Sequence, residues 1–459
     1  MPVLTPTSLP DLVAAMRLPG PIAIRGAGYS QGGQTDAATV IDTSHLNRIV
    51  CITDRSVTVE AGCRWSDVIR ALNAVGRSVA EMQSYVNFSV GGAISVNCHG
   101  RGMQFGTIHD TILTMQVVTP DTTTHIVRPG DALFAAVVGG YGLVAVIYSV
   151  KLLTVENVPL RRNIRAEPRR ALSEFLRQVA SDESVVFYHG FIYPHVTDYV
   201  HHRIFCRTSV CAATNDLPES TSVTRLVNQV GEHVLRRGSM MAKIIRGHIE
   251  PMCVRKDLVC WRNQEMWYDV EDRTPYTERF SKTYLQEYFI ALPHIDNLLN
   301  VFFELTQRYH VNVLNISVRL VRTPLRRERP MLDYAPELRV AMVVYYNMWR
   351  NTIDADGVWT REMLDWVVSH GGAFYLPYLP HATPGQVRRA YPRFDELMAM
   401  KARWDPNGKL ESRWSVKYIR AHRLQSPDRT DRLMPIRPCA AAPRAIAATV
   451  ANRRFDLRQ

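Results

Sequence analysis

One stretch, from Met82 to Gly102, most constrains what this chain can fold into. It reads MQSYVNFSVGGAISVNCHGRG, with aromatic and β-branched residues first, then a Gly-Gly pair, then a polar run that ends in His99-Gly100. Glycine lets the backbone approach a bulky ligand where a Cβ would collide, and the serines and Asn97 offer groups that hydrogen-bond one. The apolar period is too short for a helix, and the glycines are too many for a core strand. The stretch therefore predicts a ligand-binding loop.

The segment S-V-G-G-A-I-S-V-N-C-H-G, which begins at Ser89, resembles the second flavin-contacting loop of the FAD-linked oxidases. This is the vanillyl-alcohol oxidase/p-cresol methylhydroxylase (PCMH) superfamily. The nearest branches are the aldonolactone and alditol oxidases and decaprenylphosphoryl-ribose oxidase, which carry the same Gly-Gly-(Ala/Ser) core followed by His-Gly. The resemblance implies that FAD is bound here by Gln83, Ser84, Ser89, Val90, Gly91, Gly92, Ile94, Ser95, Asn97, His99 and Gly100.

A second glycine loop follows a predicted strand, PIAIR, and includes Gly26, Gly28 and Gly33. Its spacing is similar to a nicotinamide-dinucleotide fingerprint, but that fingerprint needs a helix that opens at the last glycine. QTDAATVIDTSHL follows instead, and because it reads as a turn and a strand, the Rossmann interpretation fails. A nest of backbone N–H groups binds pyrophosphate without a helix. The loop resembles R-G-x-x-x-S-x-G-G-Q, the pyrophosphate loop of the same superfamily, which implies FAD contacts from Arg25, Gly26, Ala27, Gly28, Tyr29, Ser30, Gly33 and Gln34.

The resemblance extends over the first third of the chain and implies the architecture. A third loop and the strand after it are expected to touch the adenine half of FAD, through Gly139, Gly140, Gly142, Val146 and Ile147. The expected fold class is α+β. A two-subdomain FAD-binding PCMH-type domain would span residues 1–155, and a substrate-cap domain with a large antiparallel sheet residues 156–385. A C-terminal return to the flavin domain would span residues 386–420, and a disordered basic tail residues 421–459.

The net charge of +12 does not indicate nucleic-acid binding. The tail holds eight Arg and three Asp, a net charge of +5, and elsewhere the excess is scattered without an interleaved Arg and aromatic stripe. His189, His195, His201 and His202 have no carboxylate or Cys partner at ligand spacing, so no metal is expected.

The eight cysteines form no C-x-x-C pair, and the N-terminus lacks a signal-peptide pattern, so a cytoplasmic location is expected. The uncharged run 133–150 is similar in length to a membrane span. We interpret it as a short helix over 132–138, capped by Asp131, followed by a buried strand. A further helix is predicted from Ser66, its N-cap, to Gly76.

Tyr29 stands where many relatives have a histidine that is bonded covalently to the flavin ring. Tyrosine cannot form that bond, so the resemblance implies non-covalent FAD. A cysteinyl link through Cys98 or Cys63 is the alternative.

Four residues are candidates for catalysis: His99, Arg319, Tyr378 and His381. Imidazole exchanges protons near neutral pH, which suits His99, although a histidine that only braces its loop is the competing interpretation. Arg319 lies on an apolar predicted strand, where a charge needs a partner. Tyr378 and His381 occupy the place where relatives put a catalytic Lys or His.

Three carboxylates lie in apolar and aromatic runs, and we expect them to form ion pairs with Arg262 or Arg279 rather than to bind substrate: Glu265, Asp269 and Glu287. The function that the resemblance implies is that of an FAD-dependent oxidoreductase. It would oxidise a CH–OH group of a sugar, lactone or polyol-like small molecule by hydride transfer to flavin N5. Dioxygen, a quinone or a dye-like acceptor would then reoxidise the flavin. The alternatives are a dehydrogenase or reductase without oxygen reactivity and a degenerate, non-catalytic flavin-binding module.

Overall fold

The computed structural model describes residues 2–193, 196–210, 212, 214–218, 244, 257–268, 281–349 and 353–420. The strands are β1 Val3–Leu4, β2 Ile22–Arg25, β3 Thr39–Asp42, β4 Ile49–Ile52, β5 Ser56–Glu60, β6 Arg77–Val79, β7 Ile112–Val118, β8 Thr124–Val127, β9 Val146–Glu156, β10 Pro159–Pro168, β11 Val185–Tyr193, β12 Val196–Arg207, β13 Val259–Trp261, β14 Ser281–Ile290, β15 Asn312–Val321, β16 Arg339–Trp349 and β17 Ala373–Phe374. The α-helices are α1 Leu9–Met16, α2 Trp65–Ala74, α3 Val90–Ser95, α4 Ala132–Val137, α5 Leu172–Ser181, α9 Arg262–Met266, α10 Ile295–Arg308, α11 Ile353–Ser369, α12 Pro384–Ala390, α13 Phe394–Trp404 and α14 Arg413–Ser415.

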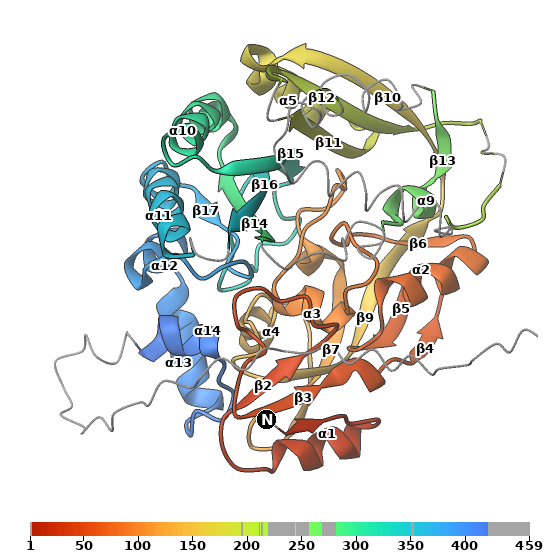
Figure 1. The fold of residues 1–459 in the computed structure, drawn as a ribbon. Helices are drawn as coiled ribbons and strands as arrows, with labels where there is room; N and C mark the ends of the chain where they lie inside the picture. The colour runs from red at the N-terminus through yellow and green to blue at the C-terminus, as the bar shows by residue number, and fades with distance from the viewer. Residues whose placement is uncertain are drawn as a thin grey trace, which may run out of the picture.

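The N-terminal part of the chain forms two sheets. A parallel sheet has the order β1-β3-β2, and an antiparallel sheet has the order β4-β5-β9-β7-β8, with β6 paired to β9. Helix α2 covers the second sheet with Trp65, Val68, Ile69 and Leu72, which recur at helical spacing and are all fully buried. These elements, red to orange in Figure 1, make one body in the lower part of the view.

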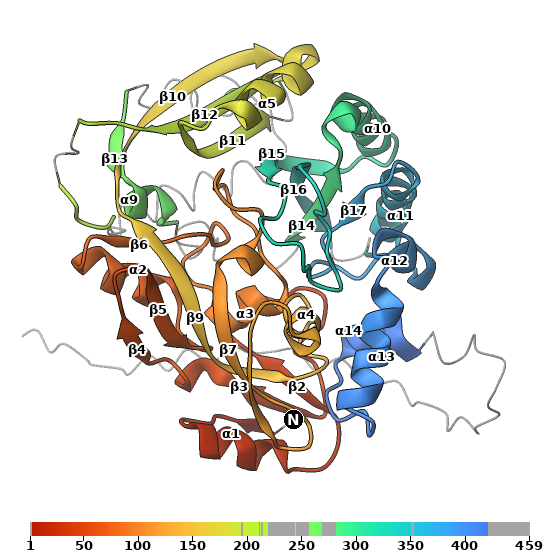
Figure 2. The same cartoon turned by 180° about the vertical axis from the view of Figure 1, so that it is seen from behind.

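An eight-stranded sheet stands over this body, with the order β13-β10-β12-β11-β15-β16-β14-β17. Its strand pairs are antiparallel, so the prediction of an α+β fold with a large antiparallel sheet is confirmed. Helices α5, α10 and α11 lie on its outer side (Figures 1 and 2). The Phe175 ring of α5 stacks on the His202 ring of β12, with the ring centroids 3.8 Å apart, so His202 belongs to the outer face. Because side chains alternate along a strand, the residues before and after His202 face the N-terminal body.

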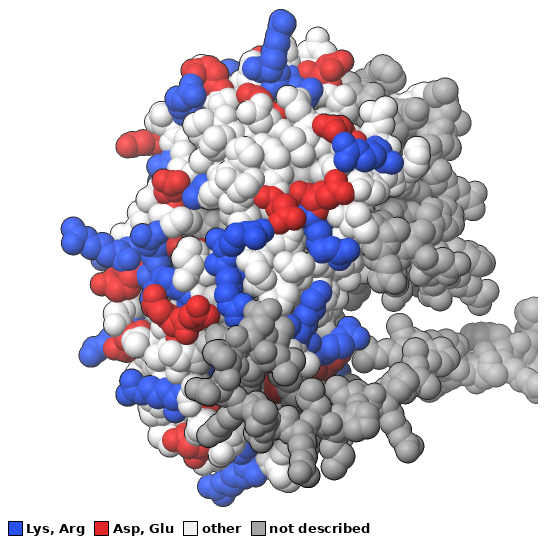
Figure 3. Space-filling view, turned by 90° about the vertical axis from the view of Figure 1, so that its left-hand side faces the viewer, with Lys and Arg blue, Asp and Glu red and all other residues white. Residues whose placement is uncertain are grey.

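The chain passes from the first body to the large sheet between Glu156 and Pro159 and later returns to the first body. The backbone N–H of Ile22 donates to the carbonyl of Lys409, and that of Glu411 donates to the carbonyl of Ile22, so the return segment pairs beside β2. Helix α13 packs on α4. On the face drawn in Figure 3, Lys and Arg are interspersed with Asp and Glu, and no patch of one sign dominates.

Two local predictions were wrong. The glycine-rich stretch contains a short helix, α3, where we expected only loop. Ser95 Oγ donates to the carbonyl of Gly91 within it, 2.8 Å away. Helix α2 begins at Trp65 with Arg64 as its N-cap, two residues before the predicted cap, because the backbone N–H groups of Trp65 and Ser66 donate to the carbonyls of Phe88 and Val86.

Several predictions lie outside the described residues: the disordered tail 421–459, and the ion-pair partners Asp269 and Arg279. His195 also lies there. None of the helices among the described residues is long and apolar enough to cross a bilayer.

Candidate functional site

The two glycine loops predicted to bind FAD lie against each other. The backbone N–H of Ala27 in the first loop donates to Ser89 Oγ in the second, 3.2 Å away. A Cβ added to Gly26 would overlap the same Ser89 Oγ and lie 3.3 Å from Ser89 Cβ. Glycine at position 26 is therefore what allows the two loops to meet.

The third predicted loop docks on the end of α3. The backbone N–H of Gly139 donates to the carbonyl of Ile94 (3.0 Å), and that of Tyr141 donates to the carbonyl of Ser95 (2.9 Å). The Tyr141 ring stacks on Trp414 of α14, with centroids 4.6 Å apart. The three predicted cofactor loops are thus joined through one short helix and its flanks.

Asn97 lies where these loops converge and shows two features of a ligand-binding residue. Its φ of 46° places the backbone in the left-handed region, which a non-glycine residue occupies at a conformational cost. Its side-chain Nδ2 and Oδ1 are buried, and neither has a hydrogen-bond partner among the described residues. Buried amides are normally satisfied, so this one fits a ligand that carries both donors and acceptors, as FAD does.

The glycines of the Met82–Gly102 stretch also allow close packing within the chain. A Cβ on Gly100 would overlap the carbonyl oxygen of Met82 and the Glu81 carboxylate, so the chain itself occupies the space on that side. The contact of Gly100 with FAD stays a prediction.

Other predicted cofactor residues have side chains that bond to the protein. Arg25 donates to Asp42 Oδ2 at 2.6 Å, so its charge is balanced within the chain. Gln34 Nε2 donates to the carbonyl of Pro377 (3.1 Å), which ties the first glycine loop to the segment that holds Tyr378. Gln83 Oε1 accepts from Trp65 Nε1. Tyr29 packs on Phe88, and Ser84 Oγ is buried without a partner among the described residues. Val146 and Ile147 lie in the core.

The predicted catalytic residues His99 and Tyr378 meet at one carboxylate. His99 Nε2 lies 2.5 Å from Glu287 Oε1 of β14, and Tyr378 Oη lies 3.3 Å from Glu287 Oε2. His99 and Glu287 are both almost fully buried. The rings of Phe289, Tyr334 and Tyr375 surround His99 edge-on, at 5.4 to 6.2 Å. A carboxylate that fixes one imidazole nitrogen gives His99 a defined orientation.

Burial and the nearby Glu287 raise the pKa of Tyr378 well above its usual value. Its phenol therefore stays protonated and donates to Glu287. Arg319 lies within electrostatic reach of Tyr378, and its Nε is buried without a hydrogen bond to the described residues. His381 lies elsewhere: its Nδ1 is 3.1 Å from Thr360 Oγ1 of α11.

The carboxylates of Glu287 and Glu265 are bonded to residues other than the predicted arginines. Glu287 is bonded to His99 and Tyr378. Glu265 binds Arg101, which follows His99 by two residues and also donates from Nη2 to the carbonyl of Glu265, at 2.7 Å. Sequence reasoning missed Arg101 because its partner lies 164 positions away along the chain.

Sequence reasoning also missed Glu81 and Tyr334. Burial raises the pKa of Glu81 to about 8, and its Oε2 has no hydrogen-bond partner among the described residues. Tyr334 Oη donates to the carbonyl of Asn97, 2.5 Å away. A carboxylate immediately before the glycine stretch was the one signal that could have identified Glu81.

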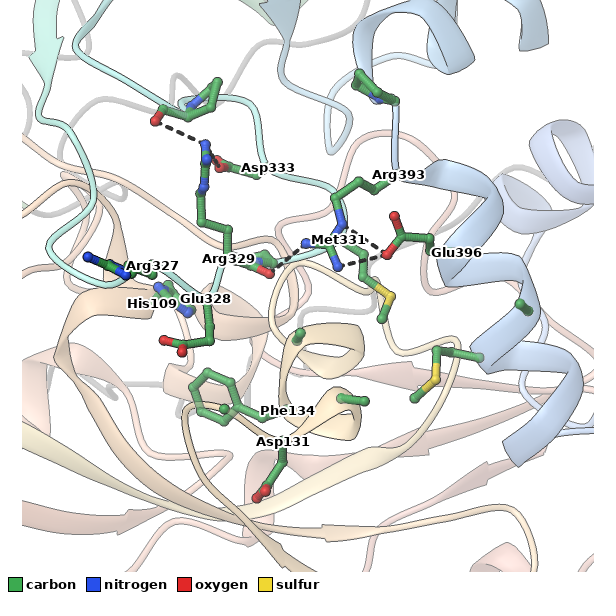
Figure 4. A pocket seen from close by; sticks show the side chains of 18 residues that line it. His109, Asp131, Phe134, Arg327, Glu328, Arg329, Met331, Asp333, Arg393 and Glu396 are labelled. Carbon is green, nitrogen blue, oxygen red and sulfur yellow. Dashed lines mark hydrogen bonds and ion pairs between the residues drawn. The ribbon is translucent and has the colours of Figure 1, made fainter.

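A cavity of about 790 Å³ lies apart from this site, between α4, α13 and the segment 327–336 (Figure 4). Four of its charged side chains form two pairs: Arg393 donates to Glu396 at 2.8 Å, and Arg329 lies 3.6 Å from Asp333. None of the predicted site residues lines it. Asp333 faces this cavity, whereas the next residue, Tyr334, reaches Asn97.

The part of the chain that the structure describes contains no cluster of three or more His, Cys, Asp or Glu that could hold a metal ion. The site suits a flavin: it combines three joined glycine loops, the buried Asn97 amide without a partner among the described residues and a histidine that a carboxylate orients. The fold and these features together define a flavin-binding α+β protein.

Comparison with known proteins agrees. Residues 2–128 match the family described as FAD binding domain. An uncharacterised oxidoreductase in the fasciation locus of Rhodococcoides fascians is 30% identical over 170 residues, which are 35% of this chain and 39% of that protein. Alditol oxidase from a Streptomyces species is 28% identical over 100 residues, 22% of this chain and 24% of that protein. L-galactono-1,4-lactone dehydrogenase 1 from Oryza sativa is 30% identical over 136 residues, 28% of this chain and 23% of that protein.

The matched regions thus span less than two fifths of each of these relatives. A solvent-stable cholesterol oxidase has the same fold, with a TM-score of 0.68 and 16% identity over 91% of this chain and 94% of that chain. These matches confirm the resemblance to the FAD-linked oxidase superfamily and the presence of its FAD binding domain in this chain.

Proposed function

We propose that this chain is an FAD-dependent oxidoreductase that oxidises a CH–OH group of a small molecule. The observation that carries the proposal is the buried pair of His99 and Glu287, in which His99 Nε2 lies 2.5 Å from Glu287 Oε1. His99 lies at the end of the glycine stretch to which the other two predicted FAD-contacting loops are bonded. A base of defined orientation beside a cofactor loop suits removal of a hydroxyl proton. Bound FAD would supply the acceptor for the hydride.

Glu287, Tyr378 and Arg319 have separate roles in this proposal. Glu287 accepts from Nε2 of His99, so His99 would take the proton on Nδ1, which lies 3.3 Å from the carbonyl oxygen of Gly100. Glu287 would then stabilise the imidazolium that forms. Tyr378 donates to the second oxygen of Glu287 and so keeps the carboxylate in place. Arg319 lies within electrostatic reach of Tyr378 and would stabilise negative charge on the reduced flavin when FAD is bound. The aromatic rings around His99 exclude water, which strengthens these interactions.

FAD is bound without a covalent link in this proposal. Tyr29 occupies the place of the linking histidine. Burial raises the pKa of Cys63 to about 12 and raises that of Cys98 as well, so neither thiol forms the thiolate that a cysteinyl link needs. The yellow colour should therefore stay in the supernatant when the protein is precipitated with trichloroacetic acid. Colour in the washed pellet would refute non-covalent binding.

The test of the function is anaerobic bleaching of the purified yellow protein with a panel of polyols, sugars and lactones. With a substrate found in this way, His99→Ala should slow flavin reduction by roughly 100-fold or more, in line with the loss of a general base. The control is His370→Gln, an exposed histidine at the end of α11, which should reduce at the wild-type rate. Equal reduction rates for His99→Ala and wild type would remove His99 from the chemistry. A protein that stays colourless with added FAD would favour a non-catalytic module.

The relatives favour a second candidate. They include both an oxidase and a dehydrogenase, alditol oxidase and L-galactono-1,4-lactone dehydrogenase. A dehydrogenase would use the same base and differ in its acceptor. Peroxide formation under air supports the oxidase, whereas reduction of only a quinone or dye supports the dehydrogenase.

A further inference from the structure

The inner face of the large sheet carries a row of basic side chains, of which only Arg319 has a role in the proposed oxidation. His189 of β11 pairs directly with Arg203 of β12. On the other side of β11, Gly190 pairs with Val318 of the antiparallel strand β15. His189 therefore lies beside Arg319, and both side chains are on the face of the sheet opposite to that of Val318. Neighbouring strands are about 4.8 Å apart, so Arg203 and Arg319 lie on either side of His189 and all three side chains can reach one ligand. We call these three residues the basic row.

The basic row faces the N-terminal body, on the side where His99 lies. Tyr188, the neighbour of His189, belongs to the outer face, where its hydroxyl is 2.9 Å from His202 Nδ1. Residue 189 therefore points inward, and Arg101 of the glycine stretch reaches it: Arg101 Nη1 lies 3.3 Å from His189 Nδ1. The residue that contacts the basic row, Arg101, thus lies two positions along the chain from the proposed base, His99.

His189 presents a buried donor that has no partner among the described residues. A guanidinium only donates, so the contact with Arg101 makes Nδ1 the acceptor, and the neutral ring carries its proton on Nε2. Burial and the surrounding arginines lower the pKa of His189 well below its usual value, which keeps the ring neutral. Nε2 is buried without a hydrogen bond to the described residues, and the ring is only 3% exposed. An unmet buried donor costs free energy unless a ligand satisfies it.

The charges beside this donor are mostly positive. Glu265 is bonded to Arg101 and is therefore occupied. Burial raises the pKa of Glu81 to about 8, so this carboxyl is largely protonated at neutral pH and offers little charge to Arg319. Arg203 lies over the Phe191 ring, 4.7 Å from its centroid, and Arg319 Nε has no hydrogen bond to the described residues. Two guanidinium groups and an N–H donor thus converge on one inner surface.

We propose that the basic row binds an oxyanion group of the substrate, a carboxylate or a phosphate, and so holds the CH–OH carbon toward His99. Guanidinium forks match the oxygens of both groups, and a flanking neutral N–H adds a third donor. The inference rests on the proposed function for its substrate, but not for its test. The row would make the substrate an acid or a phosphate ester rather than a neutral polyol.

The test measures anion binding to the FAD-loaded protein without turnover. Inorganic phosphate, sulfate and acetate are titrated separately, and the flavin difference spectrum and isothermal calorimetry report binding. We expect saturable binding that weakens with added sodium chloride. Preference for phosphate and sulfate over acetate indicates a phosphate ester, and the reverse preference indicates a carboxylate. Failure of all three anions to bind at 50 mM, roughly five times a weak 10 mM dissociation constant, would overturn the inference while leaving the proposed function intact.

Variants locate the binding. Arg203→Gln should raise the dissociation constant of the preferred anion roughly 10-fold or more, because one charge-assisted pair is lost, and Arg203→Lys should recover part of it. The control is Arg165→Gln: this exposed residue pairs with His202, so it lies on the outer face of the same sheet. An equal effect of the two Gln variants would overturn the proposal. Loss of FAD from Arg203→Gln, with the anion affinity of the remaining holoprotein unchanged, would also overturn it, because the row would then serve the cofactor.

Discussion

The contact between the two glycine loops gives the sharpest test of the cofactor site. In Gly26→Ala, the new methyl would overlap Ser89 Oγ, and Ser89 is itself buried with only 3% exposure. The hydroxyl must rotate away, and the backbone N–H of Ala27 then loses its 3.2 Å bond. Loss of one such bond, with its donor left unmet, costs about 2 kcal/mol. If FAD needs both loops in place, this corresponds to a roughly 30-fold weaker affinity for FAD.

The assay is titration of the apoprotein with FAD, followed by quenching of flavin fluorescence. Gly385→Ala is the control, because the nearest atom to its added Cβ is 3.9 Å away and it lies on α12, apart from both loops. The double variant Gly26→Ala/Ser89→Ala removes the overlapping hydroxyl but also the acceptor of the Ala27 N–H, so it should bind FAD about as weakly as Gly26→Ala. Wild-type FAD affinity in Gly26→Ala would refute the view that these loops together hold the cofactor.

Three further predictions concern the buried polar groups. Burial raises the pKa of Glu81 from 4.5 to about 8, so the folded protein binds an extra proton, and stability falls as pH rises between these values. Glu81→Gln should therefore flatten the decline of Tm between pH 5 and 8, with a gain on the order of 3 kcal/mol at pH 7; an unchanged decline would contradict this. Glu265→Gln leaves the charge of Arg101 buried without its carboxylate and should lower the free energy of unfolding by about 3 to 5 kcal/mol in urea titration, whereas a loss below 1 kcal/mol would count against the pair. His381→Gln should leave the rate of anaerobic flavin reduction unchanged, because His381 contacts Thr360 rather than Glu287, and a 10-fold slower rate would return it to the site.

Local patterns predicted much of the fold because local physics determines those parts. The nearly continuous apolar run over 339–349, RVAMVVYYNMW, is typical of a buried strand, and it forms β16. The predicted helix over 132–138 agrees with α4 to within one residue, since Asp131 and the following Gly-Gly pair limit it at both ends. The start of α2 differs because the carbonyls of Val86 and Phe88, further along the chain, accept from its first N–H groups in place of a Ser side chain.

The site was predictable only in part, for a physical reason. His99 and Tyr378 carry chemistry that marks them in the sequence, but Glu287, which joins them, stands in an ordinary strand 188 positions from His99. Its position in the sheet is set by register with β16, where Glu287 pairs with Val343, and no local pattern encodes that pairing. The same is true of the basic row, whose three members come from three strands. Contacts made by long-range strand pairing leave no periodic trace in the sequence.

The short segment from His99 to Gly102 explains how two bodies of this molecule can act as one site. His99 bonds to β14, the carbonyl of Arg101 accepts from the backbone N–H of Tyr188 on β11, and Gly102 forms a bridge with Phe187. This segment directly follows the loop that contacts the first glycine loop. The segment therefore joins strands β14 and β11 of the large sheet to the end of the second glycine loop. Arg101, which contacts His189, and His99, which contacts Glu287, are two residues apart on it.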